Sequence, residues 1–174
     1  ELISELGFHA TPMSLIIKKS GAAAGTIFHH FKNKEDLIDT LYSELKMEMG
    51  KAIVQNLDCE DHYKNKFILI WKNLFYFYSE NRKKFEYLEN YANSPFVKKE
   101  VKAISRRNYQ AAIDFFESGI QMGILRHMPV ILLTEIVFNN VATFTRMILL
   151  EEIEFSEDLL SKTIQSSWDS VKIN

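Results

Sequence analysis

The stretch of residues 7–34 constrains the fold most, because it predicts two short helices joined by a tight turn. Thr11 is a candidate N-cap, and Pro12 suits the first helical position, where a missing N–H costs nothing. The pair Ser20-Gly21 ends this helix, since glycine adopts the left-handed conformation of a C-terminal cap. A second short helix follows over about 23–30. Helices this short are unstable alone, so they must pack on neighbours and present one face for use.

The charge pattern of this stretch favours a helix–turn–helix that binds DNA. Residues 6–34 contain no Asp or Glu, whereas they contain four lysines: Lys18, Lys19, Lys32 and Lys34. Small side chains at 22–26 would let the backbone of the second helix approach a groove closely, and lysines at its margins can neutralise phosphates. At about 100° per residue, the outward-facing side chains of this helix are Gly25, Thr26 and His29.

These residues resemble a known family. Gly7-Phe8, Thr11, Ile16, Gly21 and the run GTIFHHFKNKEDL over 25–37 are similar to the DNA-binding domain of the tetracycline-repressor (TetR/AcrR) family. Ala23 and Ala24 stand where the family often has Ser and Lys, and Phe28 stands where it often has Tyr.

The resemblance implies an all-α fold with two domains. Residues 1–45 are expected to form the helix–turn–helix DNA-binding domain, in which 1–6 is the end of the first helix. Residues 46–174 are expected to form a helical bundle for ligand binding and dimerisation.

The resemblance also implies which residues contact DNA. We expect the contacts to a palindromic operator to come from ten residues: Thr11, Ala23, Ala24, Gly25, Thr26, Phe28, His29, His30, Lys32 and Lys34. Of these, Thr11, Phe28, Lys32 and Lys34 are assigned to phosphates and sugars, and Gly25, Thr26 and His29 to base edges. Lys34 begins a helix whose N-terminus itself attracts phosphate. For Lys18 and Lys19, a phosphate contact and a solvated face are equally consistent with the sequence.

The rest of the chain predicts further helices and little else. Hydrophobic residues make up 47% of 174 residues, with only 6 Gly and 3 Pro, which favours a compact all-α protein. The expected helices are 33–55, capped by Asn33; 63–81; 82–93, ended by Ser94-Pro95; 96–122, ended by Gly119 and Gly123; 129–152, opened by Pro129; and 156–173, capped by Ser156. The helix over 63–81 is apolar on nearly every face, so we expect it to be buried.

The bundle provides two further functional expectations. The resemblance implies a homodimer through the helices at about 129–152 and 156–173; alternatively, their apolar residues only complete the core of a monomer. Side chains that could line a cavity for a small apolar or aromatic ligand are Trp71, Phe75, Tyr78, Tyr87, Tyr91, Phe115, Met122, Phe138 and Phe144. Each of these alone is more typical of a core residue, and the resemblance favours a cavity for the group.

Other kinds of site find little support. His9, His29 and His30 lack a helical H-x-x-x-H spacing or a cysteine partner, so no metal is expected. No phosphate loop, nucleophile elbow or carboxylate pair argues for an enzyme, and no cofactor is expected. The stretch 130–150 comes closest to a membrane span, but Glu135, Asn139, Asn140 and Arg146 interrupt it. The single cysteine, Cys59, suits a reducing cytoplasm.

The sequence therefore predicts a cytoplasmic, ligand-responsive, homodimeric repressor that a small molecule releases from its operator. Two alternatives remain open at this point. One is a constitutive DNA-binding regulator without a ligand, and the other is an aromatic-lined helical enzyme or carrier with an incidental helix–turn–helix.

Overall fold

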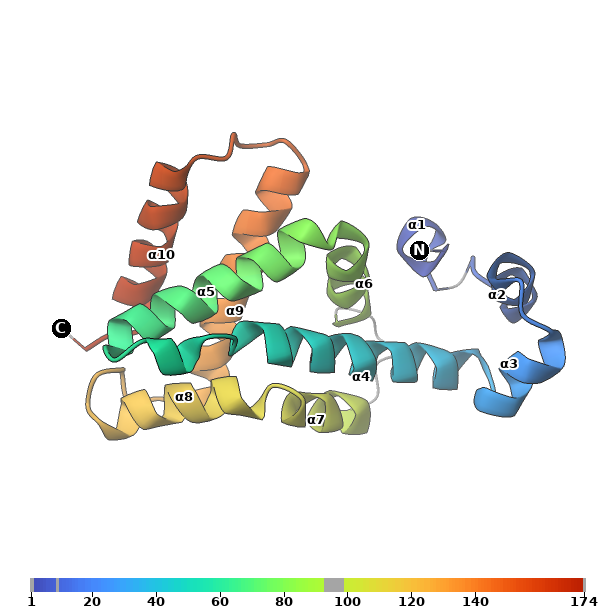
Figure 1. The fold of residues 1–174 in the computed structure, drawn as a ribbon, viewed down its shortest axis with the longest axis horizontal. Coiled ribbons are helices and arrows are strands. Elements are labelled where there is room, and N and C mark those ends of the chain that lie inside the picture. Colours follow the sequence, from blue (N-terminus) through green and yellow to red (C-terminus); the bar gives the residue numbers. More distant parts are fainter. Residues whose placement is uncertain (1, 9, 93–98, 174) are drawn as a thin grey trace. The chain divides into compact units, whose positions relative to one another are not determined.

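The computed structural model describes residues 2–8, 10–92 and 99–173 of the chain (Figure 1). His9, which was considered above as a metal ligand, lies outside these residues. The Ser94-Pro95 pair, which was predicted to end a helix, also lies outside them. The described helices are α1 Leu2–Leu6, α2 Met13–Ser20, α3 Ala24–His30, α4 Lys34–Ile53, α5 Tyr63–Glu80, α6 Arg82–Ala92, α7 Lys99–Arg107, α8 Gln110–Gln121, α9 Val130–Leu149 and α10 Glu157–Val171. A 3-10 turn, Leu57–Cys59, precedes α5. The predicted all-α fold is confirmed.

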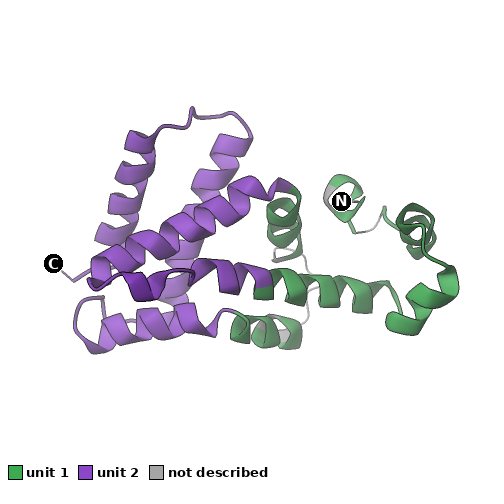
Figure 2. Ribbon diagram, viewed as in Figure 1, with its two compact units in different colours: residues 1–47, 83–108 green, residues 48–82, 109–174 purple. Residues whose placement is uncertain are grey.

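The chain divides into two compact units (Figure 2). Unit 1 consists of Glu1–Met47 and Lys83–Asn108, and unit 2 consists of Glu48–Arg82 and Tyr109–Asn174. Residues 83–108 thus group with the N-terminal unit, although the sequence analysis assigned them to the C-terminal domain. The functional division after residue 45 stays a prediction.

Local capping chemistry sets several helix ends as predicted. Gly21 ends α2 with a positive φ of 70°, the left-handed conformation that glycine adopts without strain. Asn33 caps α4, because its Oδ1 accepts a hydrogen bond from the Asp36 N–H at 2.8 Å. Ser156 caps α10 in the same way, its Oγ accepting from the Leu159 N–H at 3.1 Å.

The predicted single helix over 96–122 is wrong, since α7 and α8 are separate helices. Asn108 breaks the helix by donating its side-chain amide to the carbonyl of Ser43 at 2.9 Å. Tyr109 then leaves helical geometry, with φ −125° and ψ 31°. Gly119 does not end a helix either, because it is buried within α8; the chain turns at Gly123, where φ is 68°.

The expectation that α5 is buried all round is also wrong. One stripe of this helix is buried, and it contains Phe67, Ile70, Trp71, Leu74, Phe75 and Tyr78. On the other side Ile68 and Leu69 are half-buried, and Tyr76 is 39% exposed. The neighbours of α5 are α9, α10 and the Leu57–Cys59 turn, and they leave part of its surface open to solvent.

The core of unit 2 forms around α9, which packs against α5, α8 and α10. Among the described residues α9 is the one helix that is long and apolar enough to cross a membrane, with a mean hydropathy of 1.2. Buried helices of globular proteins share this property, and eight residues of α9 are buried here, from Leu133 to Thr145. The packing of α9 is therefore that of a core helix.

Candidate nucleic-acid interface

The helix–turn–helix consists of α2, the Gly21 turn and α3. In α3 only Ile27 is buried, and Phe31 just beyond it is half-buried. Eight of the ten predicted DNA-binding residues are exposed around this side chain: Ala23, Ala24, Gly25, Thr26, Phe28, His29, His30 and Lys32. Because Ile27 is the one buried side chain of this seven-residue helix, most of the surface of α3 is open to a partner.

The electrostatics of this surface suit a polyanion. Lys18 and Lys19 are exposed in the last turn of α2, and Asp36, a nearby acid, accepts the Lys32 N–H at the start of α4 with its Oδ2. This hydrogen bond links Asp36 to the backbone that precedes α4.

Gly25 leaves the exposed face of α3 without a side chain at this position. A Cβ built at Gly25 meets nothing within 4 Å, and its φ is not in the left-handed region. Neither packing nor backbone conformation therefore requires glycine there. Glycine at this exposed position leaves the backbone of α3 open to a close approach from outside.

The structure corrects two predictions about Thr11. Its side chain is fully buried, and its hydroxyl donates to the carbonyl of Gly7 at 2.8 Å. The N-cap of α2 is Pro12, which makes no side-chain cap bond. Thr11 therefore stabilises the turn before α2, and both the predicted cap and the predicted phosphate contact of its hydroxyl are wrong.

Lys34 is half-buried and also holds the fold together. Its Nζ donates to the carbonyl of Phe8 at 2.7 Å, which ties the segment before α2 to the start of α4. One of its three N–H donors is thus used inside unit 1, so a phosphate contact can use only the others.

Two residues predicted to bind ligand, Tyr87 and Tyr91, belong to an aromatic cluster in unit 1. The Tyr87 hydroxyl donates to the carbonyl of Ile38 at 2.8 Å, and the Tyr91 hydroxyl donates to Asp39 Oδ1. The ring of Phe8 meets both tyrosines edge-on, with centroids 6.0 and 5.6 Å away. Burial raises the pKa of both tyrosines. Their observed role is to join α6 to α4 and to the segment that precedes α2.

The other seven predicted ligand residues lie in unit 2, where the structure brings only some of them together. Trp71, Phe75 and Phe144 form one cluster, with centroid distances of 5.4 to 6.2 Å, and Phe155, which the sequence analysis missed, stacks on Phe75. Burial of these three is expected of core residues, but the Nε1 of Trp71 is buried without a hydrogen-bond partner.

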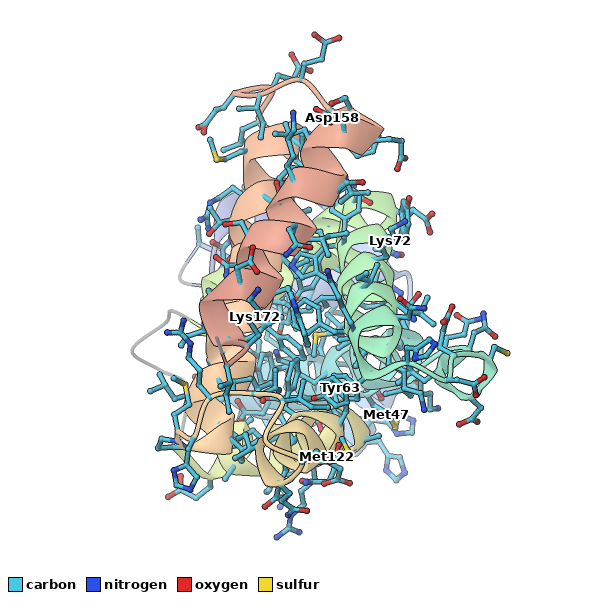
Figure 3. All side chains as sticks on the ribbon, turned by 90° about the vertical axis from the view of Figure 1, so that its left-hand side faces the viewer. Met47, Tyr63, Lys72, Met122, Asp158 and Lys172 are labelled. Carbon is cyan, nitrogen blue, oxygen red and sulfur yellow. The ribbon has the colours of Figure 1, made fainter. Side chains whose placement is uncertain are left out.

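The remaining members lie apart from this cluster. Tyr78 donates its hydroxyl to the sulfur of Met49 at 3.5 Å, and Phe138 packs on Phe116 at 6.3 Å. Phe115 stacks on Tyr63 with centroids 4.3 Å apart. Met122 lies at the end of α8 (Figure 3) with 58% of its surface exposed, so it lines no enclosed cavity.

Metal binding gains no support from the described residues. Within 2–8, 10–92 and 99–173, no group of three or more His, Cys, Asp or Glu could hold an ion. The rings of His29 and His30 lie in a T-shaped arrangement with centroids 5.4 Å apart on an exposed helix. Two such donors suit phosphate oxygens or base edges.

A glycine turn, an exposed second helix without acidic residues and an all-helical second unit define a helix–turn–helix DNA-binding protein. Comparison with known protein families identifies the family of DNA-binding proteins to which the chain belongs. Residues 1–41 match "Bacterial regulatory proteins, tetR family", and residues 62–172 match "Tetracyclin repressor-like, C-terminal domain". The chain belongs to the TetR family of bacterial transcriptional regulators.

Known relatives agree with this assignment. An uncharacterized HTH-type transcriptional regulator of Haemophilus influenzae is 23% identical over 98% of this chain and 90% of its own length. A fatty acid metabolism regulator protein of Bacillus subtilis is 45% identical, over 30% of this chain and 26% of its own length.

Solved structures share the fold across almost the whole chain. A TetR family transcription regulator from a Shewanella species has a TM-score of 0.92 at 23% identity, covering 99% of this chain and 93% of its own. The regulator FadR of Bacillus subtilis, solved in complex with stearoyl-CoA, has a TM-score of 0.73 at 21% identity, covering 97% and 90%.

Proposed function

We propose that the chain is a cytoplasmic, homodimeric repressor that binds a palindromic operator and leaves it when a ligand binds, and that it has no enzymatic role. The observation that carries this proposal is the exposed face of α3, which has no acidic residue and needs no glycine for its own packing. Two such helices would enter successive major grooves about 34–36 Å apart. Gly25, Thr26 and His29 would read base edges, and Lys32, with the free donors of Lys34, would hold phosphates.

The test of DNA recognition is selection of sites from a random pool of duplex DNA. Enrichment of a two-fold symmetric sequence, bound with an affinity that falls steeply with salt, supports the proposal. If no sequence is enriched and no duplex is retained at low ionic strength, the proposal fails.

Homodimerisation is proposed through α9 and α10. Partly exposed apolar residues follow one another along this part of unit 2: Leu132, Ile136, Met147, Leu150 and Leu159. Such a stripe suits an isologous contact with a second copy. We expect the double substitution Ile136→Glu with Met147→Glu to convert the dimer into a 20.3-kDa monomer, because two carboxylates would be buried in the contact.

Light scattering after size exclusion measures the mass of these variants. A matched control places glutamates at Ala111 and Gln121, which are exposed on α8, and we expect it to remain dimeric. A doubly substituted protein that stays dimeric, or a native chain that is monomeric at micromolar concentration, contradicts the proposed interface.

The effector is proposed to bind in unit 2 near Trp71, Phe75 and Phe144. Two observations support an apolar ligand that carries a hydrogen-bond acceptor. The indole N–H of Trp71 is buried without an acceptor, a costly arrangement that a ligand carbonyl would relieve. In addition, a regulator of the same fold is solved in complex with stearoyl-CoA.

Tryptophan fluorescence with stearoyl-CoA as the probe tests the effector site, because the chain contains only two tryptophans. In a Trp168→Phe variant we expect saturable quenching of Trp71 and release of the selected DNA. Trp71→Phe keeps an aromatic ring but removes the N–H donor together with the second fused ring, so release should need about tenfold more ligand. If long-chain acyl-CoA leaves fluorescence and DNA affinity unchanged, the constitutive regulator is the better description.

A further inference from the structure

A groove within unit 1 lies between α4 and α7 and belongs to none of the sites described above. Its volume is about 210 Å³, and it is lined by Asp39, Thr40 and Ser43 from α4 and by Val101, Ile104 and Ser105 from α7. At about 100° per residue, positions i and i+4 of each helix face the same way, so these side chains converge from two sides. The groove is therefore part of the packing of the two helices.

The most informative group in the groove is the hydroxyl of Ser105. Only 1% of the residue is exposed, and its Oγ is buried without a hydrogen-bond partner. By contrast, the Ser43 Oγ accepts from the Asn108 side-chain amide at 3.1 Å, and the Thr40 hydroxyl donates to the Asp36 carbonyl at 2.7 Å. Since buried polar groups in proteins are nearly always paired, the lone Ser105 hydroxyl indicates that a partner enters the groove from outside.

The other lining groups define the chemistry of that partner. Asp39 is the only residue among the six with an ionisable side chain, and its Oδ1 accepts a hydrogen bond from the Tyr91 hydroxyl. Val101 is half-buried and Ile104 is 56% exposed, so together they form an apolar wall. A ligand that matches both has a donor-rich cationic head and a short alkyl body.

Volume limits the size of the ligand. A short alkyl chain suits a groove of about 210 Å³, whereas most of a long acyl chain would extend beyond it into solvent. It is thus distinct in size and chemistry from the proposed effector region of unit 2.

We propose that this groove binds a small primary alkylammonium ion, with the ammonium on Asp39 and Ser105 and the alkyl body on Val101 and Ile104. The site has a direct route to the DNA-binding surface, because α4 starts at the Asn33 cap, three residues after the end of α3. Occupation of the groove would alter how α4 packs against α7 inside the unit that carries α3. Binding here requires neither the operator nor the effector of unit 2.

The test is an NMR titration of the chain with n-butylammonium chloride at constant ionic strength, with 1-butanol as a neutral ligand of the same shape. We expect saturable shifts confined to α4 and α7, in the millimolar range for so small a ligand. The ammonium should bind about tenfold more tightly than the alcohol, because only it pairs with the carboxylate. Equal affinity for both ligands, or shifts spread over the surface, would overturn the proposal.

Two variants separate the contributions of the groove. Asp39→Asn retains an acceptor for Tyr91 but removes the charge, and we expect about tenfold weaker ammonium binding. Ser105→Ala removes the unpaired hydroxyl, so binding should weaken several-fold while the melting temperature holds or rises. Asp58→Asn, at an exposed carboxylate of unit 2, is the matched control and should bind as the native chain does. If both Asp39→Asn and Ser105→Ala bind the ammonium ion as tightly as the native chain, the proposed site is wrong. This conclusion does not depend on the results of the DNA-binding and acyl-CoA experiments.

Discussion

Replacing Gly25 by glutamate is expected to lower the affinity for the selected operator by about 100-fold or more without weakening the fold. The side chain has room in the free protein, because a Cβ at Gly25 meets nothing within 4 Å. Glutamate is also the better helix former by up to ~1 kcal/mol, and Gly25 lies in the first turn of α3, where negative charge is favoured. In the complex, the same carboxylate would face phosphates and fill the space that the backbone needs.

Fluorescence anisotropy with labelled operator measures the loss, and urea unfolding measures stability. Gly25→Ala separates bulk from charge, and we expect it to cost about tenfold in affinity. Ala111→Glu carries the same charge on the exposed face of α8 and should retain native affinity. If Gly25→Glu binds the operator as tightly as the native chain, α3 is not the reading helix.

Sequence predicted the helix ends that depend on local chemistry. The turn at Gly21, the Asn33 cap of α4 and the Ser156 cap of α10 each depend on one residue and its immediate neighbours. Such side-chain-to-backbone bonds close within three residues, so residue type and position suffice to predict them. The exposed face of α3 followed from the same short-range periodicity.

Errors arose where the partner of a residue is distant in the sequence or where two local roles compete. Asn108 ends α7 by bonding to Ser43, 65 positions earlier, and no local pattern contains this contact. Thr11 is a good N-cap by composition, yet its hydroxyl bonds backward to Gly7 and is buried. Lys34, which was predicted to hold a phosphate, donates to the carbonyl of Phe8. In each of these cases the packing of unit 1 decides which role the side chain has.

The candidate ligand residues show the same limit on a larger scale. Helical spacing predicts that a residue faces an apolar core, but it does not say in which of the two units the residue packs. Tyr87 and Tyr91 therefore looked equivalent to Trp71 and Phe75, although they join α6 to α4 in unit 1. What distinguishes Trp71 is an unpaired N–H in the core of unit 2, which only the structure can reveal.

Replacing Gly119 by alanine is expected to destabilise the chain by about 2–3 kcal/mol, because α8 has no space for a methyl group there. A Cβ at this position would lie 2.5 Å from Tyr63 Cζ and 2.8 Å from Leu125 Cδ1, with the Tyr63 hydroxyl closer still. Tyr63, at the start of α5 (Figure 3), cannot turn aside without loss. Its ring stacks on Phe115 at 4.3 Å, and its hydroxyl donates to the Phe115 carbonyl at 2.9 Å.

Gly25→Ala is the matched control for this substitution, since the same change in α3 meets open space and should raise stability by up to ~1 kcal/mol. The free energy of unfolding in urea measures both. Tyr63→Phe alone should cost about 1 kcal/mol through the lost hydrogen bond. Combined with Gly119→Ala it should cost less than the sum of the two changes, because the nearest clashing atom, the hydroxyl, has gone although Cζ remains. Strict additivity in this double-mutant cycle, or a native-like Gly119→Ala, would show that α5 and α8 are not held together through Tyr63.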